Sequence, residues 1–154
     1  MRLLPVLLGL LLPACSGDGA GGFPVPPPMR LAGLERPASP NTALAAPAGF
    51  QPHPDIVTRV YAVPADALFA AIRAVAATQP RTFLAASYGE RRQAHYVVRS
   101  AVFNFPDLVT VEVGADSTLV LWSRSVYGRS DLGVNARRLT AWLAALDAAL
   151  PASK

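Results

Sequence analysis

The chain has 154 residues, of which 52% are hydrophobic and 16% charged, and it carries a formal charge of +4 at pH 7. When an N-terminal signal and a stretch rich in Pro, Gly and Ala are set aside, roughly a hundred residues remain. That is enough for one small domain that needs neither a metal nor a disulfide to form its core. The basic residues are scattered along the chain, which argues against a nucleic-acid partner.

Residues 1–15 have the features of an export signal. Arg2 precedes an apolar run from Leu3 to Leu12. This run of about ten residues is too short to span a bilayer and has the length of a signal-peptide core. The sequence therefore predicts a protein that is exported from the cytoplasm.

The end of this signal resembles the bacterial lipobox. It reads Leu12-Pro13-Ala14-Cys15, with an unusual Pro in the middle, and its Cys is the only one in the chain. The resemblance implies that Cys15 carries a diacylglycerol thioether and further acylation, such as palmitate, which anchors a protein stably to the cell envelope. Ser16 in place of Asp favours the outer membrane over the inner membrane. The alternative is an ordinary cleaved signal that happens to contain a Cys.

Residues 16–54 are rich in Pro, Gly and Ala and show no sustained apolar periodicity. This composition predicts an extended, semi-rigid tether, which could hold the domain on the order of 100 Å from the lipid. His53 lies between two prolines of this segment and is expected to be solvated.

Residues 55–150 contain the periodic patterns of a domain, and residues 151–154 form a tail. We predict strands at Ile56–Val63, Thr82–Tyr88, Gln93–Phe103, Leu108–Val113 and Ser117–Ser125, and helices from Pro64 to about Thr78 and from Ala136 to Leu150. The fold class is therefore α+β, with an antiparallel sheet of about five strands in the order β-α-β-β-β-β-α and both helices on one face. In the fourth strand, valines alternate with Leu108, Thr110 and Glu112, which predicts one buried and one wet face. Asn135 is the expected N-cap of the last helix.

The loop between the last strand and the last helix concentrates the polar chemistry of the domain. Arg137 and Arg138 fall in the first turn of the helix, where the helix dipole disfavours cations by roughly 0.3–1 kcal/mol each. Something should offset this cost. The candidate polar cluster comprises Arg99, Asp107, Ser123, Ser125, Ser130, Asp131, Asn135, Arg137 and Arg138. It is either a structural lock, in which Asp107 or Asp131 pairs with an arginine, or a site for a small anion.

Residues 123–138 read Ser-x-Ser-x-x-Gly-x-Ser-Asp-Leu-Gly-Val-Asn-x-Arg-Arg, which resembles the signature of the domain-of-unknown-function family 1499. The resemblance extends over roughly residues 39–148 and includes Ser39-Pro40-Asn41 and Val98-Arg99-Ser100. It implies no cofactor and no established activity, and it implies an exported or lipid-anchored bacterial protein. The chain departs from the family pattern at Thr42, where the family has Cys, and at Leu108 and Thr110, where the family has carboxylates.

A serine hydrolase is the alternative from a different class, using Ser125, Ser130 and Asp131. Its nucleophile should precede a catalytic His, yet His53 and His95 both come before these serines. No second His or Cys gives His95 a metal-ligand spacing. We therefore expect an uncharacterised lipid-anchored envelope protein with a non-catalytic binding or structural domain. Its expected partners are the membrane, through the anchor, and an unknown protein or small anionic ligand bound at the Ser125–Arg138 loop.

Overall fold

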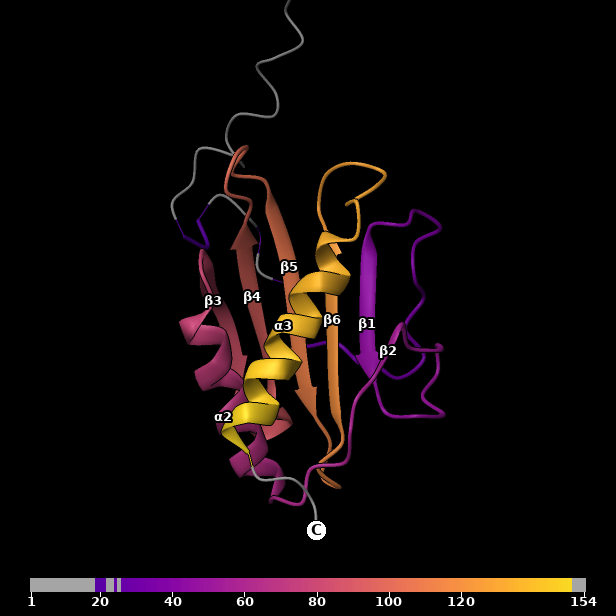
Figure 1. Cartoon of the computed structure of the whole chain (residues 1–154), viewed down its shortest axis with the longest axis vertical. Helices are drawn as coiled ribbons and strands as arrows, with labels where there is room; N and C mark the ends of the chain where they lie inside the picture. The colour runs from indigo at the N-terminus through magenta and orange to yellow at the C-terminus, as the bar shows by residue number, and fades with distance from the viewer. Residues whose placement is uncertain (1–18, 22–23, 25, 151–154) are drawn as a thin grey trace, which may run out of the picture.

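The computed structural model describes residues 19–21, 24 and 26–150, which form a six-stranded sheet with two α-helices packed on one face (Figure 1). The elements are β1 (Thr42–Ala46), β2 (Ile56–Val57), α2 (Ala65–Thr78), β3 (Thr82–Tyr88), the short 3-10 helix η2 (Gly89–Arg91), β4 (Gln93–Arg99), β5 (Pro106–Val113), β6 (Leu119–Ser125) and α3 (Val134–Ala149). The strand order across the sheet is β2-β1-β6-β5-β4-β3. Neighbouring strands are antiparallel except β1 and β2. The predicted α+β class is confirmed.

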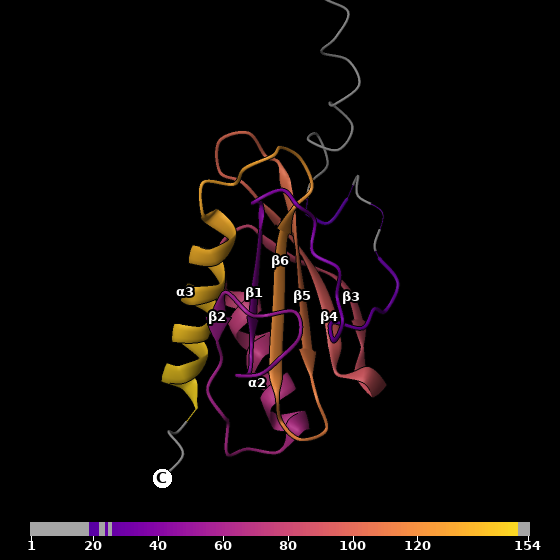
Figure 2. The ribbon, with the colours of Figure 1, turned by 90° about the vertical axis from the view of Figure 1, so that its right-hand side faces the viewer.

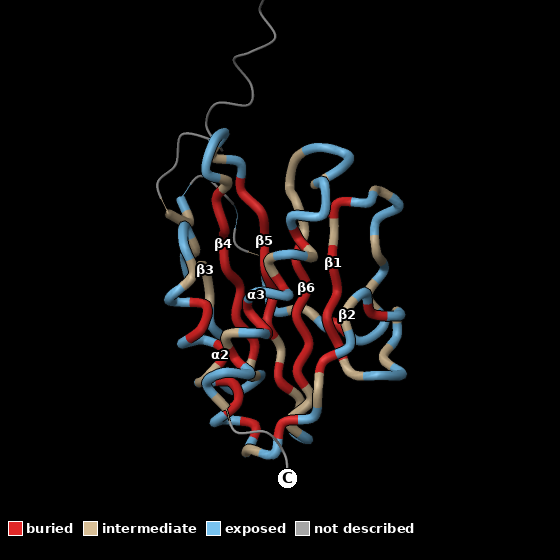
Figure 3. Tube along the Cα trace, viewed as in Figure 1, coloured by how far each residue is buried: buried red, intermediate tan, exposed pale blue. Residues whose placement is uncertain are grey.

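The two helices cover the sheet with the apolar stripes that their sequences predict. In α2, Leu68 and Ile72 are fully buried, and in α3 the same is true of Leu139 and Leu146. Trp142 of α3 lies edge-on to Tyr96 of β4, with 5.6 Å between the ring centroids. These side chains form the main core together with the valines of β5 (Figure 3). Among the described residues, neither helix is long and apolar enough to cross a bilayer.

The segment predicted as a tether contains an inner strand of the sheet. The residues of β1 pair with β6 on one side and β2 on the other, and four of its five residues are buried. The predicted domain start at residue 55 is therefore wrong, and the sheet has six strands instead of five. The strand predicted at Ile56–Val63 is short for a related reason, because it pairs only with the last two residues of β1.

The second face of the sheet is also covered, by the residues that precede β1. Leu31 is fully buried there against Trp122 of β6, and Met29 packs beside it. The Met29 amide donates to Oε1 of Gln93 on β4 at 2.8 Å. Figure 2 shows residues 26–34 on the side of the sheet away from α3. The face of β5 that was predicted to be exposed to solvent is therefore buried at its centre, where Thr110 is only 3% exposed.

Candidate functional site: the polar cluster at the start of α3

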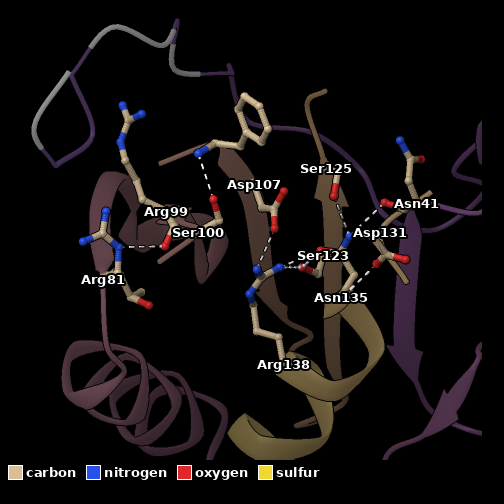
Figure 4. Close-up of polar contacts among 12 residues, drawn as sticks. Asn41, Arg81, Arg99, Ser100, Asp107, Ser123, Ser125, Asp131, Asn135 and Arg138 are labelled. Atoms are coloured by element: carbon tan, nitrogen blue, oxygen red, sulfur yellow. Dashed lines mark hydrogen bonds and ion pairs between the residues drawn. The ribbon is translucent and has the colours of Figure 1, made fainter. Parts of the chain in front are cut away.

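Arg138 and Asp107 form the centre of the cluster. Arg138 projects from α3 towards β5, and its Nη2 lies 2.6 Å from Oδ2 of Asp107, with only 10% and 11% of the two side chains exposed (Figure 4). Its Nη1 donates to Oγ of Ser123 at 2.8 Å and to Oδ1 of Asn135 at 2.6 Å. One guanidinium thus satisfies three acceptors, from two strands and its own helix.

Asn135 extends this network across β6 towards β1. Its side chain is fully buried, and its Nδ2 donates to the carbonyl of Asn41 at 2.9 Å and to Oγ of Ser125 at 3.1 Å. The Oγ of Ser123 donates to its Oδ1 at 2.5 Å. Asn41 in turn donates to the Gly128 carbonyl at 2.7 Å. The network therefore links α3 to β6, to the start of β1 and to the loop after β6.

Asp131 performs the capping that the sequence assigned to Asn135. The N-cap residue of α3 is Gly133, with φ of 77°, and it has no side chain to accept a hydrogen bond. The Asp131 carboxylate instead accepts from the Gly133 amide at 2.9 Å and from the Asn135 amide at 2.8 Å. Burial opposes ionisation, but these amides hold the pKa of Asp131 below its usual value. Asp131 stabilises the helix start through backbone contacts, without pairing with an arginine in the structure.

Arg137 ends the first turn of α3 and Arg138 begins the second, and the two arginines differ in their surroundings. Arg138 is largely buried and paired, whereas Arg137 is exposed and donates from Nη1 to the Leu132 carbonyl at 2.9 Å. Ser130 is exposed, and its Oγ accepts from the Leu132 amide at 3.3 Å. The Asp107 carboxylate beside Arg138 and the Leu132 carbonyl beside Arg137 offset the unfavourable interaction of these cations with the helix dipole.

Arg99 does not join this group. It follows the alternation of β4 onto the face away from the helices, where it is 3% exposed. Its Nε donates to the Gly19 carbonyl at 2.9 Å, and its other nitrogens reach the carbonyls of Gly21 and Asn104. Arg81, which was not among the nine predicted cluster residues, donates to the Arg99 carbonyl at 3.0 Å. Of the nine predicted cluster residues, Arg99 therefore lies apart from the other eight.

Asn41 belongs to the cluster but was assigned to the tether. It is 7% exposed, and its contacts join the loop after β6 to β1. The Ser39-Pro40-Asn41 resemblance to the family was the sequence signal that could have identified it, because a shared polar residue in a Pro-rich segment points to a specific contact.

Among the described residues, the hydrogen bonds of the cluster serines Ser123, Ser125 and Ser130 do not involve a histidine. His95 lies on the face of the sheet away from the helices, fully buried, with Nδ1 3.0 Å from Oγ1 of Thr110. Within the described part of the chain, no group of three His, Cys, Asp or Glu residues could hold a metal ion. The cluster therefore lacks the nucleophile–base pair that a serine hydrolase requires.

A groove of about 730 Å³ lies elsewhere, between α2 and the edge strand β3. It is lined by alanines of α2 together with Phe83, Leu84 and Tyr96, and Arg73 is the one charged residue among its described lining. The Arg73 guanidinium lies 5.5 Å from the centre of the Phe69 ring, also on α2. This lining offers no acid–base pair.

The comparisons with known proteins identify the domain. The family model described as "Protein of unknown function (DUF1499)" matches residues 34–146, which include β1, the polar cluster and most of α3. No curated protein and no solved structure matches the chain. The match begins upstream of β1, in agreement with the structure. The chain belongs to the DUF1499 family.

Proposed function

We propose that this member of the DUF1499 family is a lipid-anchored protein of the cell envelope whose domain acts as a non-catalytic binding or structural module. The observation that carries the anchor is Cys15, the only cysteine, which directly follows a signal-like apolar run and Ala14. The outer membrane is the proposed destination, because Ser16 follows the Cys.

The non-catalytic part of the proposal is supported by the state of the polar cluster. Its buried polar side chains pair with one another, Arg138 with Asp107 and Asn135 with Ser123, and the half-buried Asp131 accepts from two backbone amides. A buried polar network in which each member is satisfied stabilises a fold, whereas a reactive site keeps groups available for substrate. A protein partner or a small anion would then bind to the domain surface.

Mass spectrometry and fractionation of the full chain test the anchor. The protein with Cys15 should be recovered with membranes, and its N-terminal peptide should begin at Cys15 and carry the added mass of a diacylglycerol and an acyl chain. Cys15→Ser should move it to the soluble fraction. Ser16→Ala is the matched control and should stay lipidated. An unmodified parent N-terminal peptide, or a Cys15→Ser variant that stays in membranes, would contradict the proposal.

A further inference from the structure

One end of the domain exposes an unusual number of large apolar side chains. They come from two loops, residues 100–105 between β4 and β5 and residues 126–133 between β6 and α3, which lie at the same end of the sheet (Figure 1). Val102 is 81% exposed, Phe103 67% and Leu132 84%. Phe103 stacks on Phe105 at 5.6 Å, and Phe105 contacts Tyr127 of the other loop at 6.1 Å between ring centroids. We call these five residues the apolar tip.

The first loop of the apolar tip, residues 100–105, is closed by two hydrogen bonds between its ends. The Ser100 Oγ accepts from the Phe105 amide at 2.9 Å, and the Ser100 amide donates to the Phe105 carbonyl at the same distance. The two phenylalanines are therefore presented to solvent by a closed turn, and they are not turned into either core. Single exposed apolar residues are common, but several large ones gathered at one end of a domain, three of them with their rings in contact, indicate a binding surface.

The first described residue, Gly19, lies beside this tip. Gly19 is fixed by its carbonyl to Nε of Arg99, the last residue of β4, which directly precedes the first tip loop. Cys15 is four residues upstream of Gly19. Four residues span at most about 14 Å even when fully extended. A lipid on Cys15 would thus bring the end of the sheet that carries the apolar tip to the bilayer surface.

The charges around the tip suit the same surface. Arg81, Arg129 and Arg137 are exposed at this end of the domain. Asp131 is the one carboxylate of the two tip loops, and its two oxygens accept backbone amides. Aromatic and apolar side chains with arginines nearby are favoured at the membrane interface. The aromatic rings enter the boundary of the acyl chains, and the guanidiniums bind lipid phosphates.

We infer that the apolar tip is a membrane-docking surface that inserts into the headgroup region and seats the domain on the bilayer next to its anchor. This inference rests on the proposed lipid anchor and adds an orientation to it. The long tether that composition predicted would have left the domain free of the lipid. Instead, β1 and the segment before it fold back onto the sheet, so only a few residues separate the anchor from the domain.

A pair of fluorescent probes tests this orientation in the intact lipoprotein. In Val102→Cys the probe is attached at the tip, and in Ala115→Cys, the matched control, it is attached at an exposed turn beyond the far end of β5. Eight strand residues separate the two ends by about 25 Å. Cys15 is blocked by its thioether, so an environment-sensitive thiol dye labels only the introduced Cys. The purified, labelled proteins are placed in vesicles of phosphatidylethanolamine and phosphatidylglycerol that contain a lipid quencher at the headgroup level.

The probe at position 102 should shift to the blue and lose at least half of its emission to the quencher, while the probe at position 115 should behave as in water. Equal exposure of both probes to water, with the lipid on Cys15 confirmed by mass, would overturn the docking surface and leave the anchor intact. A protein whose mass shows no lipid would overturn both proposals.

Discussion

At the scale of single residues, the buried Arg138–Asp107 ion pair is the main reason to regard the candidate site as a structural lock. A charge pair that is about nine-tenths buried lies in surroundings where each ion depends on the other, because water cannot replace the lost partner. Arg137, one position earlier, has the same charge and also lies near the positive end of the helix dipole, but it is exposed. The two neighbouring arginines therefore provide a matched comparison.

Asp107→Asn and Arg138→Gln should each lower the free energy of unfolding by about 3 kcal/mol, since each leaves one buried charge unpaired. Arg137→Gln should change it by less than about 0.5 kcal/mol, or stabilise slightly through the dipole. Urea unfolding followed by tryptophan fluorescence measures all three. Equal losses for Arg137→Gln and Arg138→Gln would show that burial of the pair does not matter.

His95 should make the stability of the domain depend on pH. Its ring is fully buried, lies edge-on to Tyr88 at 5.7 Å, and has its pKa lowered by burial. Protonation therefore favours the unfolded chain, in which a histidine titrates near pH 6.5. The contribution of the neutral ring is fully present above about pH 6.5 and is lost as the pH falls below that value.

The melting temperature of the parent should accordingly decrease between about pH 7.5 and pH 5.5, above the range in which carboxylates titrate. His95→Gln should flatten this dependence, whatever its effect on stability at neutral pH. His53→Gln changes the other, exposed histidine and should leave the pH dependence as it is. A pH dependence that persists in His95→Gln and disappears in His53→Gln would refute the assignment.

The sequence predicted which residues make up the cluster better than it predicted which of them pair with one another. Asp107, Ser123, Asn135 and Arg138 do come together, because strand alternation and the helix phase place them on the same side of the sheet. Arg99 was included as a possible partner of Asp107 or Asp131, and it lies on the opposite face. The exchange of roles between Asn135 and Asp131 could not be seen beforehand. Both residue types cap helices well, and only the left-handed Gly133 shows where the helix begins.

At the scale of elements, the periodic segments were predictable and the alanine-rich inner strand β1 was not. The range of α2 matches its pattern closely, because a 3.6-residue apolar stripe is a strong signal, and β3 spans the predicted Thr82–Tyr88. β1 reads Thr-Ala-Leu-Ala-Ala, and alanine has a low strand propensity. Pairing with β2 and β6 determines its conformation, so tertiary contacts outweigh local preference.

Truncation of Leu44 measures how firmly β1 belongs to the domain. Leu44 is fully buried against Trp122, so Leu44→Ala should cost about 2–4 kcal/mol in urea unfolding. The same change at Leu132, which is 84% exposed, should cost less than about 0.5 kcal/mol. If Leu44→Ala were as harmless as Leu132→Ala, residues 42–46 would behave as a tether in solution.

At the scale of the whole molecule, both ends of the described chain are tied to the same sheet. The segment before β1 closes one face and the helices close the other, and the polar cluster joins α3 to β5, β6 and β1. The surface left for function is then the outside of this unit, which we propose is directed by the anchor and the apolar tip. Function at this outer surface requires that the polar cluster be an internal lock and not a ligand site.

Melting temperatures with and without phosphate, at matched ionic strength, test that claim most directly. A closed network has no place for an anion, so the parent should show no shift specific to phosphate, and Asp107→Asn and Arg138→Gln should melt lower in both buffers. An anion site predicts the reverse pattern. A phosphate-specific stabilisation of the parent that both Arg137→Gln and Arg138→Gln abolish, without loss of stability in its absence, would contradict the structural lock.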